Sequence, residues 1–255
     1  MTELVKVEIQ DQVLIITLNR PEARNAINYD AAVQLAAALD ELDNNPDVVV
    51  GVLTGANNTF CSGMDLKAFA KDGQRPYVGD RGFAGICERP PRKPLIAAIE
   101  GYALAGGLEI AMSCDMMIAA ETAKFGVPET KRGIVPGSGG LLRLPDRVPY
   151  VVAMELALTG DMFSAEQAAN WGLINRVVPE GQALQGALEL AARIKENGPL
   201  AVQTAKQVIA ESRDWSQQHM FDLQRPRIAH VFVSADAKEG ATAFAEKRKP
   251  VWQGK

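Results

Sequence analysis

Apolar runs alternate with amphipathic stretches along the first two-thirds of the chain. Five runs have the length and composition of β-strands: Val13–Leu18, Val48–Leu53, Leu95–Ile99, Met116–Ala120 and Leu173–Val178. Between the first two, Tyr29–Leu42 has leucines at helical spacing, and Asn44-Asn45-Pro46 ends the predicted helix. Nearly continuous apolar strands that alternate with helices indicate an α/β fold whose sheet is covered on both faces.

Three shorter helices are predicted at Met64–Ala70, Val151–Leu158 and Ala165–Trp171. Gly160 follows the second, and Ser164 with Gln167 forms a capping box at the start of the third. Lys71–Pro94 is the least patterned section and contains four prolines. A loop of that length inside a compact domain is usually functional, although a mobile surface excursion is an equal alternative.

The pattern changes near Pro179, after which only helical segments follow. Four are predicted: Ala183–Glu196, Leu200–Ser212, Trp215–Phe232 and Ala235–Glu246. Pro226 lies inside the third and should kink or break it, because proline removes a backbone donor and its ring clashes with the preceding turn. We therefore divide the chain into a strand-containing core, residues 1–179, and a helical C-terminal region, residues 180–255.

Composition and charge narrow the function classes. The 255 residues are 47% hydrophobic and 23% charged with a net charge of −4, values typical of a soluble protein and not of a nucleic-acid binder. Three scattered cysteines and two histidines form neither a disulfide framework nor a metal site, so we expect no metal and a reduced, cytoplasmic setting. The N-terminus lacks the pattern of a signal peptide, and three acids interrupt the most apolar region, Pro94–Ala120, so we expect no membrane span.

The stretch Gly101–Asp115, GYALAGGLEIAMSCD, carries the first candidate chemistry. Gly106 and Gly107 stand at a predicted helix start, where unpaired N–H groups and the helix dipole can hold an oxygen that gains negative charge. Glu109 follows in an apolar setting. It is a candidate acid or base, but from pattern alone the simpler interpretation is an acid that complements the helix dipole.

Glu129 is a second acid beside glycine-rich backbone, since it precedes the 133–140 stretch GIVPGSGG. Together, Glu109 and Glu129 can hold a water molecule, with one carboxylate as base and the other as acid. The pattern by itself favours a solvated loop carboxylate at Glu129.

A second loop-to-helix junction, FCSGMDLK at residues 60–67, can supply another N–H group next to that of Gly106. Arg24 and Lys67 are candidates for ligand phosphates, and Asp65 is a candidate helix cap. Cys61 is not expected to act as a nucleophile, because no histidine lies near it in sequence. The glycine spacing matches neither a dinucleotide fingerprint nor a Walker loop.

An ordered set of motifs resembles the crotonase (enoyl-CoA hydratase/isomerase) family from about Val5 to the C-terminus. The motifs begin near the N-terminus with Asn19-Arg20-Pro21 and Arg24-Asn25-Ala26. They continue, in order, with FCSGMDL, GYALAGGLE, FGVPE, GIVPGSGG, LTG, AANWGLINRVV and FAEKRKP. The resemblance implies a spiral of strand–strand–helix turns with a helical C-terminal region that builds homotrimers or homohexamers. It also implies an acyl-CoA thioester substrate, with no metal or redox cofactor.

The resemblance assigns roles residue by residue. The backbone N–H groups of Met64 and Gly106 form the oxyanion hole for the thioester enolate. Glu109 and Glu129, twenty residues apart in the GGxE and FGxPE motifs, hold the water in family members that hydrate. The remaining assignments are Gly137 for positioning the water, Arg24 and Lys67 for the CoA phosphates, and Phe244 and Lys247 for the CoA of a neighbouring subunit.

Departures from the family pattern are few. Met64 occupies a position that is often a small residue, and Ala105 and Leu108 replace a glycine and a cysteine of some hydratases. We therefore expect an enoyl-CoA hydratase of fatty-acid or related acyl-CoA degradation, with carnitinyl-CoA dehydratase or enoyl-CoA isomerase as alternatives. A CoA- or RNA-binding protein without catalysis is the alternative from another class.

Overall fold

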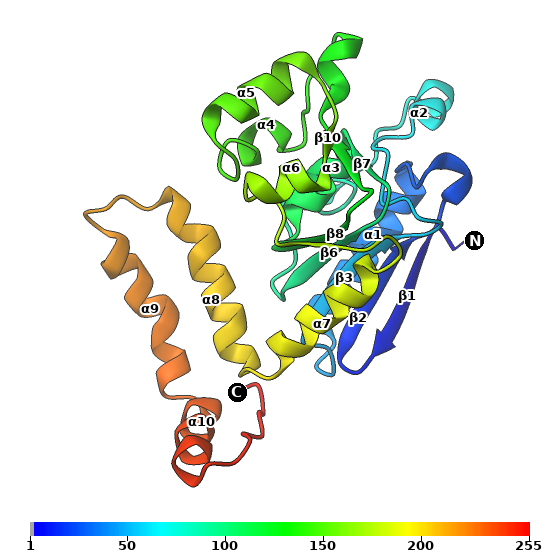
Figure 1. The fold of residues 1–255 in the computed structure, drawn as a ribbon. Coiled ribbons are helices and arrows are strands. Elements are labelled where there is room, and N and C mark those ends of the chain that lie inside the picture. Colours follow the sequence, from blue (N-terminus) through cyan, green and yellow to red (C-terminus); the bar gives the residue numbers. More distant parts are fainter. Residues whose placement is uncertain (1–2) are drawn as a thin grey trace.

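A six-stranded sheet with one antiparallel edge runs through the chain in the computed structural model, which describes residues 3–255 (Figure 1). Its strands, in spatial order, are β1 (Val5–Gln10), β2 (Val13–Leu18), β3 (Val50–Gly55), β6 (Leu95–Ile99), β8 (Met116–Ala120) and β11 (Arg176–Val178). The β1–β2 pair is an antiparallel hairpin, and every later neighbour is parallel. Parallel pairing requires a crossover after each strand, which the predicted helices provide.

A smaller sheet lies beside the large one and consists of β7 (Tyr102–Leu104), β9 (Lys124–Gly126) and β10 (Phe163–Ser164). Single-residue bridges extend this second layer, because Cys61 pairs with Ala103 and Ile27 pairs with Met64. The chain thus leaves a strand of the large sheet, passes through the second layer, forms a helix and returns. The repetition of this path is the spiral of strand–strand–helix turns that the sequence predicted.

Helices cover both faces of the large sheet. The first seven α-helices are α1 (Tyr29–Asn44), α2 (Leu66–Asp72), α3 (Gly106–Ser113), α4 (Gly140–Arg143), α5 (Tyr150–Thr159), α6 (Ala165–Asn170) and α7 (Ala183–Lys195). Alanines of α7 are buried against Ile96 and Ala98 on one face, whereas Ala97 and Ile99 pack with α1 and α3 on the other. This two-sided burial explains why the strands are apolar at nearly every position.

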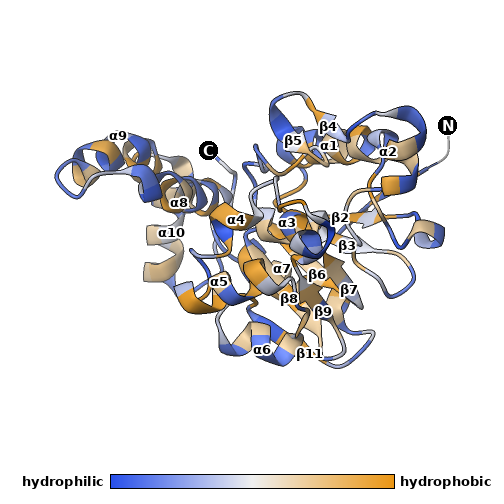
Figure 2. Cartoon of the chain, turned by 90° about the horizontal axis from the view of Figure 1, so that it is seen from above, coloured by the Kyte–Doolittle hydropathy of each residue, from blue (hydrophilic) through white to orange (hydrophobic). Residues whose placement is uncertain are grey.

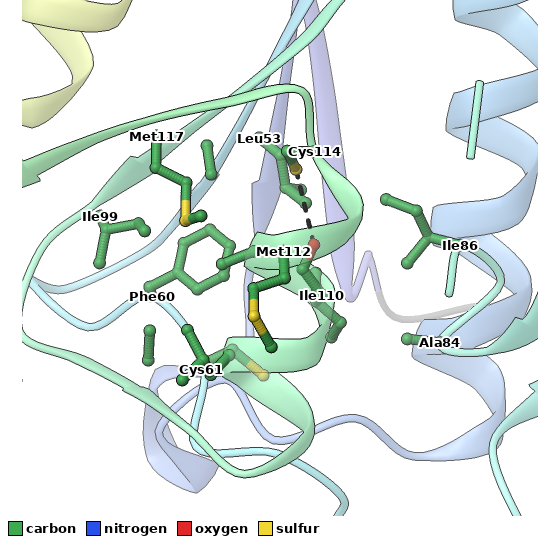
Figure 3. Packing of buried hydrophobic residues seen from close by; sticks show 14 of the residues in the cluster. Leu53, Phe60, Cys61, Ala84, Ile86, Ile99, Ile110, Met112, Cys114 and Met117 are labelled. Atoms are coloured by element: carbon green, nitrogen blue, oxygen red, sulfur yellow. Dashed lines mark hydrogen bonds between the residues drawn. The ribbon is translucent and has the colours of Figure 1, made fainter. Parts of the chain in front are cut away.

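The main core lies between the sheet and α3. Figure 3 shows Phe60 between Ile99, Met112 and Met117, all of them almost completely inaccessible to solvent. A fully buried side chain of this size contributes about 1.5–3 kcal/mol of transfer free energy. Through Met112, the same packing holds α3, the helix that carries Glu109, against the sheet.

The C-terminal helices extend away from the sheet (Figure 1). They are α8 (Pro199–Glu211), α9 (Met220–Phe232) and α10 (Ala235–Glu246). Helix α9 begins at Met220, five residues later than predicted, and it continues through Pro226, so the predicted break does not occur. The division of the chain at residue 179 stays a prediction. The first two residues of the predicted core lie outside the part of the chain that the structure describes. Helix α7, beyond that boundary, packs on the sheet.

The 71–94 segment differs from a mobile surface excursion. It contains the strands β4 (Tyr77–Val78) and β5 (Gly82–Phe83), which pair with each other. Residues 81–87 are all buried, and the Arg81 guanidinium is paired with Asp40 on α1 at 2.6 Å. Within residues 3–255, no helix combines the length and the apolar character that crossing a membrane requires.

Candidate active site

Two loops meet at the start of α3 because glycines allow them to touch. A Cβ atom added to Gly107 would overlap the carbonyl oxygen of Cys61, and one added to Gly106 would lie 2.7 Å from the Phe83 ring. Gly63 also lies close to α3, since a Cβ there would lie 3.1 Å from the backbone nitrogen of Gly106. The glycines of FCSGMDL and GYALAGGLE therefore bring the 61–64 segment against the first turn of α3.

The backbone N–H groups of Met64 and Gly106 are both free at this junction. Within residues 3–255, neither donates a hydrogen bond to a protein acceptor. The backbone on either side of Met64 is paired with Ile27: Ile27 N–H donates to the Gly63 carbonyl, and Asp65 N–H donates to the Ile27 carbonyl. Ala105, the N-cap of α3, has φ 53° and ψ −128°, an uncommon conformation for a residue with a side chain. Two unpaired donors at one place can stabilise an oxyanion.

Glu109 lies inside α3 but its side chain bonds to a different segment. Its Oε1 atom accepts the backbone N–H groups of Ser138, at 2.7 Å, and of Gly140, at 2.8 Å. The residue is only 3% exposed. Burial raises the pKa of the carboxyl, and these two hydrogen bonds and the Arg143 guanidinium partly oppose the rise. The simple dipole-complementing interpretation of Glu109 is therefore incomplete, because the carboxylate is held across the site.

Glu129 lies in a short 3-10 helix, η3 (Pro128–Arg132), and is 7% exposed. Its Oε2 atom is buried and has no hydrogen-bond partner within the described residues. Burial, reinforced by the negative charge of Glu109, raises its pKa to about 7. The interpretation of Glu129 as a solvated loop carboxylate is wrong. The two acids share one electrostatic environment, and one of them is poised to hold a proton near neutral pH.

Several neighbours of the two acids carry no sequence signal of their own. Ser138 and Gly140 hold Glu109, Phe83 covers Gly106, and Tyr77 bonds to the Ser138 hydroxyl. Only the glycine-rich composition of the 133–140 stretch pointed to this loop. Gly137, the predicted water-positioning residue, is exposed in the same loop, next to Ser138.

The phosphate candidates Arg24 and Lys67 lie on neighbouring segments, and both are exposed. The Arg24 carbonyl accepts the N–H of Ser62, and Lys67 follows the N-cap of α2. That cap is Asp65, as predicted, whose side chain also pairs with Arg20 at 2.8 Å. Two exposed cations thus flank the loop that contains Met64.

Phe244 and Lys247 lie at the end of α10, and Phe244 is 87% exposed. Figures 1 and 2 both place α10 on the opposite side of the molecule from α2, the helix that contains Lys67. Phe244 and Lys247 therefore lie on the other side of a single chain from Lys67.

The cysteines do not offer an alternative chemistry. Cys61, Cys87 and Cys114 are all buried free thiols. Burial raises the pKa of Cys61 to about 12, so that thiol is not a nucleophile near neutral pH. The described residues contain no group of three or more histidine, cysteine and acidic side chains placed to hold a metal ion.

The arrangement combines two unpaired amide donors with a pair of buried carboxylates. Amide donors stabilise the charge that develops on a carbonyl oxygen, and paired carboxylates with raised pKa values exchange protons with a substrate. Such a site suits addition to, or elimination next to, a carbonyl group.

Comparison with known proteins agrees with this chemical interpretation of the site. Residues 8–255 match the family described as Enoyl-CoA hydratase/isomerase. The chain is 45% identical to Enoyl-CoA hydratase EchA19 of Mycobacterium tuberculosis, over 98% of this chain and 96% of that one. It is 40% identical to the carnitinyl-CoA dehydratase of Proteus mirabilis, with both chains covered completely. The crystal structure of enoyl-CoA hydratase EchA1 from Mycobacterium marinum superposes with a TM-score of 0.97 at 54% identity, and both chains are covered completely.

Proposed function

Because the chain belongs to the enoyl-CoA hydratase/isomerase, or crotonase, family, we propose that it is a hydro-lyase that adds water reversibly and syn to a trans-2-enoyl-CoA thioester. The observation that carries the proposal is the buried pair Glu109 and Glu129. Both side chains are almost inaccessible, yet the Glu129 Oε2 atom has no hydrogen-bond partner within the described residues. A buried carboxylate oxygen without a partner is costly unless it receives one from a substrate.

The proposed reaction begins with the thioester carbonyl in the oxyanion hole formed by the N–H groups of Met64 and Gly106. Glu109 takes a proton from the bound water as the water oxygen bonds to the β carbon. The electron pair of the double bond moves toward the thioester, and the resulting enolate oxygen is stabilised by the two amides. The enolate then takes a proton at the α carbon from Glu129. Gly137 N–H is proposed to orient the water.

The proton inventory agrees with the electrostatics of the pair. Hydration requires Glu109 ionised and Glu129 protonated, so the active state of the pair holds one proton. Glu109 accepts two backbone hydrogen bonds that favour its ionised form, whereas Glu129 is the acid with the pKa of about 7. In the reverse reaction, dehydration, the two acids exchange their roles as base and acid, and the pair again holds one proton.

The CoA part of the substrate is proposed to lie over the exposed pair Arg24 and Lys67. Phe244 and Lys247 complete that site from another copy of the chain, in a homotrimer or homohexamer. We propose no metal or redox cofactor, since CoA arrives as part of the substrate.

A continuous spectroscopic assay tests the function. Purified protein should remove the absorbance of crotonyl-CoA and of longer trans-2-enoyl-CoA thioesters as the conjugated double bond is hydrated. Failure to consume any member of a chain-length series would reject the proposal.

Carnitinyl-CoA dehydratase is a second candidate because relatives with that name match the chain over its full length at 40% identity. Faster turnover of crotonobetainyl-CoA than of crotonyl-CoA would favour it. Consumption of a 3-enoyl-CoA instead would identify an isomerase. Salt-sensitive RNA binding without turnover would identify a non-catalytic protein.

A further inference from the structure

The Tyr77 hydroxyl lies 3.1 Å from the Ser138 hydroxyl, and the two residues are 61 positions apart in the sequence. Tyr77 belongs to β4 in the 71–94 segment, and Ser138 belongs to the glycine-rich loop before α4. The proposed mechanism uses neither side chain. A hydrogen bond between two hydroxyls from separate segments fixes the position of one segment against the other.

Ser138 is the residue that links this bond to the acid. Its backbone N–H donates to Glu109 Oε1 at 2.7 Å, and the residue is 8% exposed. The residue whose hydroxyl contacts Tyr77 thus also holds Glu109 through its backbone. A second bond joins the 71–94 segment to α4, which follows that loop, because the Arg143 guanidinium donates to the Cys87 carbonyl at 2.6 Å.

Tyr77 is also in contact with the opposite side of the site. Its ring meets Phe83 edge-on, with the ring centroids 5.9 Å apart, and the Phe83 ring covers Gly106. Tyr77 is still 38% exposed, so part of its surface is accessible to a ligand. One residue of the 71–94 segment thus contacts the wall of the oxyanion site and the loop that holds the base.

We propose that the hydroxyls of Tyr77 and Ser138 form a positioning relay for Glu109, in which Tyr77 O–H donates to Ser138 Oγ and directs the Ser138 O–H toward the carboxylate. This proposal rests on the proposed hydration of an enoyl-CoA. An acyl group that contacts Tyr77 then also influences the orientation of the base. Tyr77 and Ser138 are positioning residues, because they act through Glu109.

The relay has a pH signature that a purely structural contact lacks. The charged and titratable groups that face Glu109 are Glu129 on η3, Arg143 on α4 and the Cys87 thiol of the 71–94 segment. Burial raises the pKa of Glu109, and the Ser138 side chain, among other donors, lowers it. Loss of the Ser138 hydroxyl should therefore move the acid limb of the pH profile of kcat/KM to higher pH.

The experiment compares Tyr77→Phe, Ser138→Ala and the double variant in the crotonyl-CoA assay across pH. We expect kcat to fall about fivefold to tenfold in each single variant with KM nearly unchanged, the size of one lost hydrogen bond. The double variant should lose no more than Ser138→Ala alone, because both substitutions interrupt one path. The matched control is Tyr102→Phe, whose tyrosine is 40% exposed on β7.

Each other outcome has a defined meaning. Losses that multiply in the double variant, an unmoved acid limb in Ser138→Ala, or a change confined to KM would overturn the relay. If Ser138→Ala does not fold, the comparison of kcat between Tyr77→Phe and Tyr102→Phe still tests the relay, because Tyr77→Phe removes the hydroxyl and keeps the ring. Failure of the wild type to consume any enoyl-CoA would instead reject the proposed function, before any variant is measured.

Discussion

Glu109 Oε1 lies 2.8 Å from the backbone nitrogen of Gly140, and a Cβ atom added to Gly140 would lie 3.0 Å from that same oxygen. The residue that donates the bond therefore has to be glycine for the bond to keep its length. The carboxylate is bound by backbone N–H groups in the interior, where a hydrogen bond to a charged group contributes about 1.5–3 kcal/mol. Catalytic geometry and loop composition are linked at this one contact.

Gly140→Ala should lower kcat at least tenfold, because the added methyl group displaces either the Glu109 carboxylate or Pro136, whose Cβ would lie only 2.8 Å away. Overpacking of this kind also costs about 1–3 kcal/mol of unfolding free energy. Steady-state kinetics and thermal unfolding measure the two effects. Gly198→Ala is the matched control, since its Cβ would meet Trp252 at ordinary contact distance and its φ is −59°. Equal behaviour of the two variants would contradict the close contact.

Glu109→Gln and Glu129→Gln should each lower kcat by about a hundredfold or more, the usual contribution of general acid–base catalysis. Glutamine keeps the size of the side chain but neither accepts nor delivers the proton. We expect KM to change little, because the CoA contacts lie elsewhere. Near-normal turnover in either variant would remove that residue from the mechanism.

The raised pKa of Glu129 predicts a stability effect with a definite sign. In the unfolded chain the carboxyl ionises near pH 4.5, but in the folded chain it does so near pH 7. Between these values the folded state binds the extra proton, so the contribution of Glu129 to stability decreases as the pH rises from about 4.5 to 7. Above pH 7 the ionised, buried carboxylate is a net cost.

Glu129→Gln should therefore unfold at higher temperature than the wild type at pH 8 but at the same temperature near pH 4.5. We expect the unfolding free energy at pH 8 to rise by about 1–2 kcal/mol. This is less than the roughly 3 kcal/mol that the full pKa shift implies, because local relaxation and solvent lower the cost of the buried charge. Calorimetry at the two pH values measures the difference. A gain of equal size at both would mean that ionisation is not its cause.

Much of the fold could be predicted from the sequence, because the strands are buried on both faces and the helices carry clear end signals. Leu95–Ile99 and Met116–Ala120 have the bounds that the apolar pattern indicated, and the Ser164 capping box is present. Helix α9 is different, since no residue of α9 is buried, and a helix without a buried face has no apolar period to mark its start.

The candidate site could also be predicted only in part. Gly106 and Glu109 could be recognised because a glycine pair and an acid at a helix start form a local pattern. Their partners could not, since the contact between Glu109 and Ser138 joins residues 29 positions apart and exists only after the spiral closes. The buried state of Glu129 is likewise a product of packing, and the three residues that follow it, Thr130, Lys131 and Arg132, are polar or charged.

Ala105→Gly should stabilise the chain, because φ 53° with ψ −128° is uncomfortable for a residue with a Cβ atom and ordinary for glycine. Relief of about 1–3 kcal/mol of strain is partly offset by the greater entropy of glycine in the unfolded chain, so we expect a net gain of about 0.5–1.5 kcal/mol. Urea unfolding measures it. Ala103→Gly, at a buried strand position two residues earlier, should instead destabilise. Destabilisation by both would exclude strain at Ala105.

The separation of Lys247 from Arg24 predicts a site shared between subunits. Substitution of either residue by alanine should raise KM for crotonyl-CoA about tenfold, the loss of roughly 1.4 kcal/mol of binding, with kcat nearly unchanged. Co-expressed Arg24→Ala and Lys247→Ala chains should then form mixed oligomers in which a fraction of sites has both intact residues, and that fraction should show the wild-type KM. Mixed oligomers that keep only the raised KM would mean that the two residues do not serve one CoA, as would a fully active monomer.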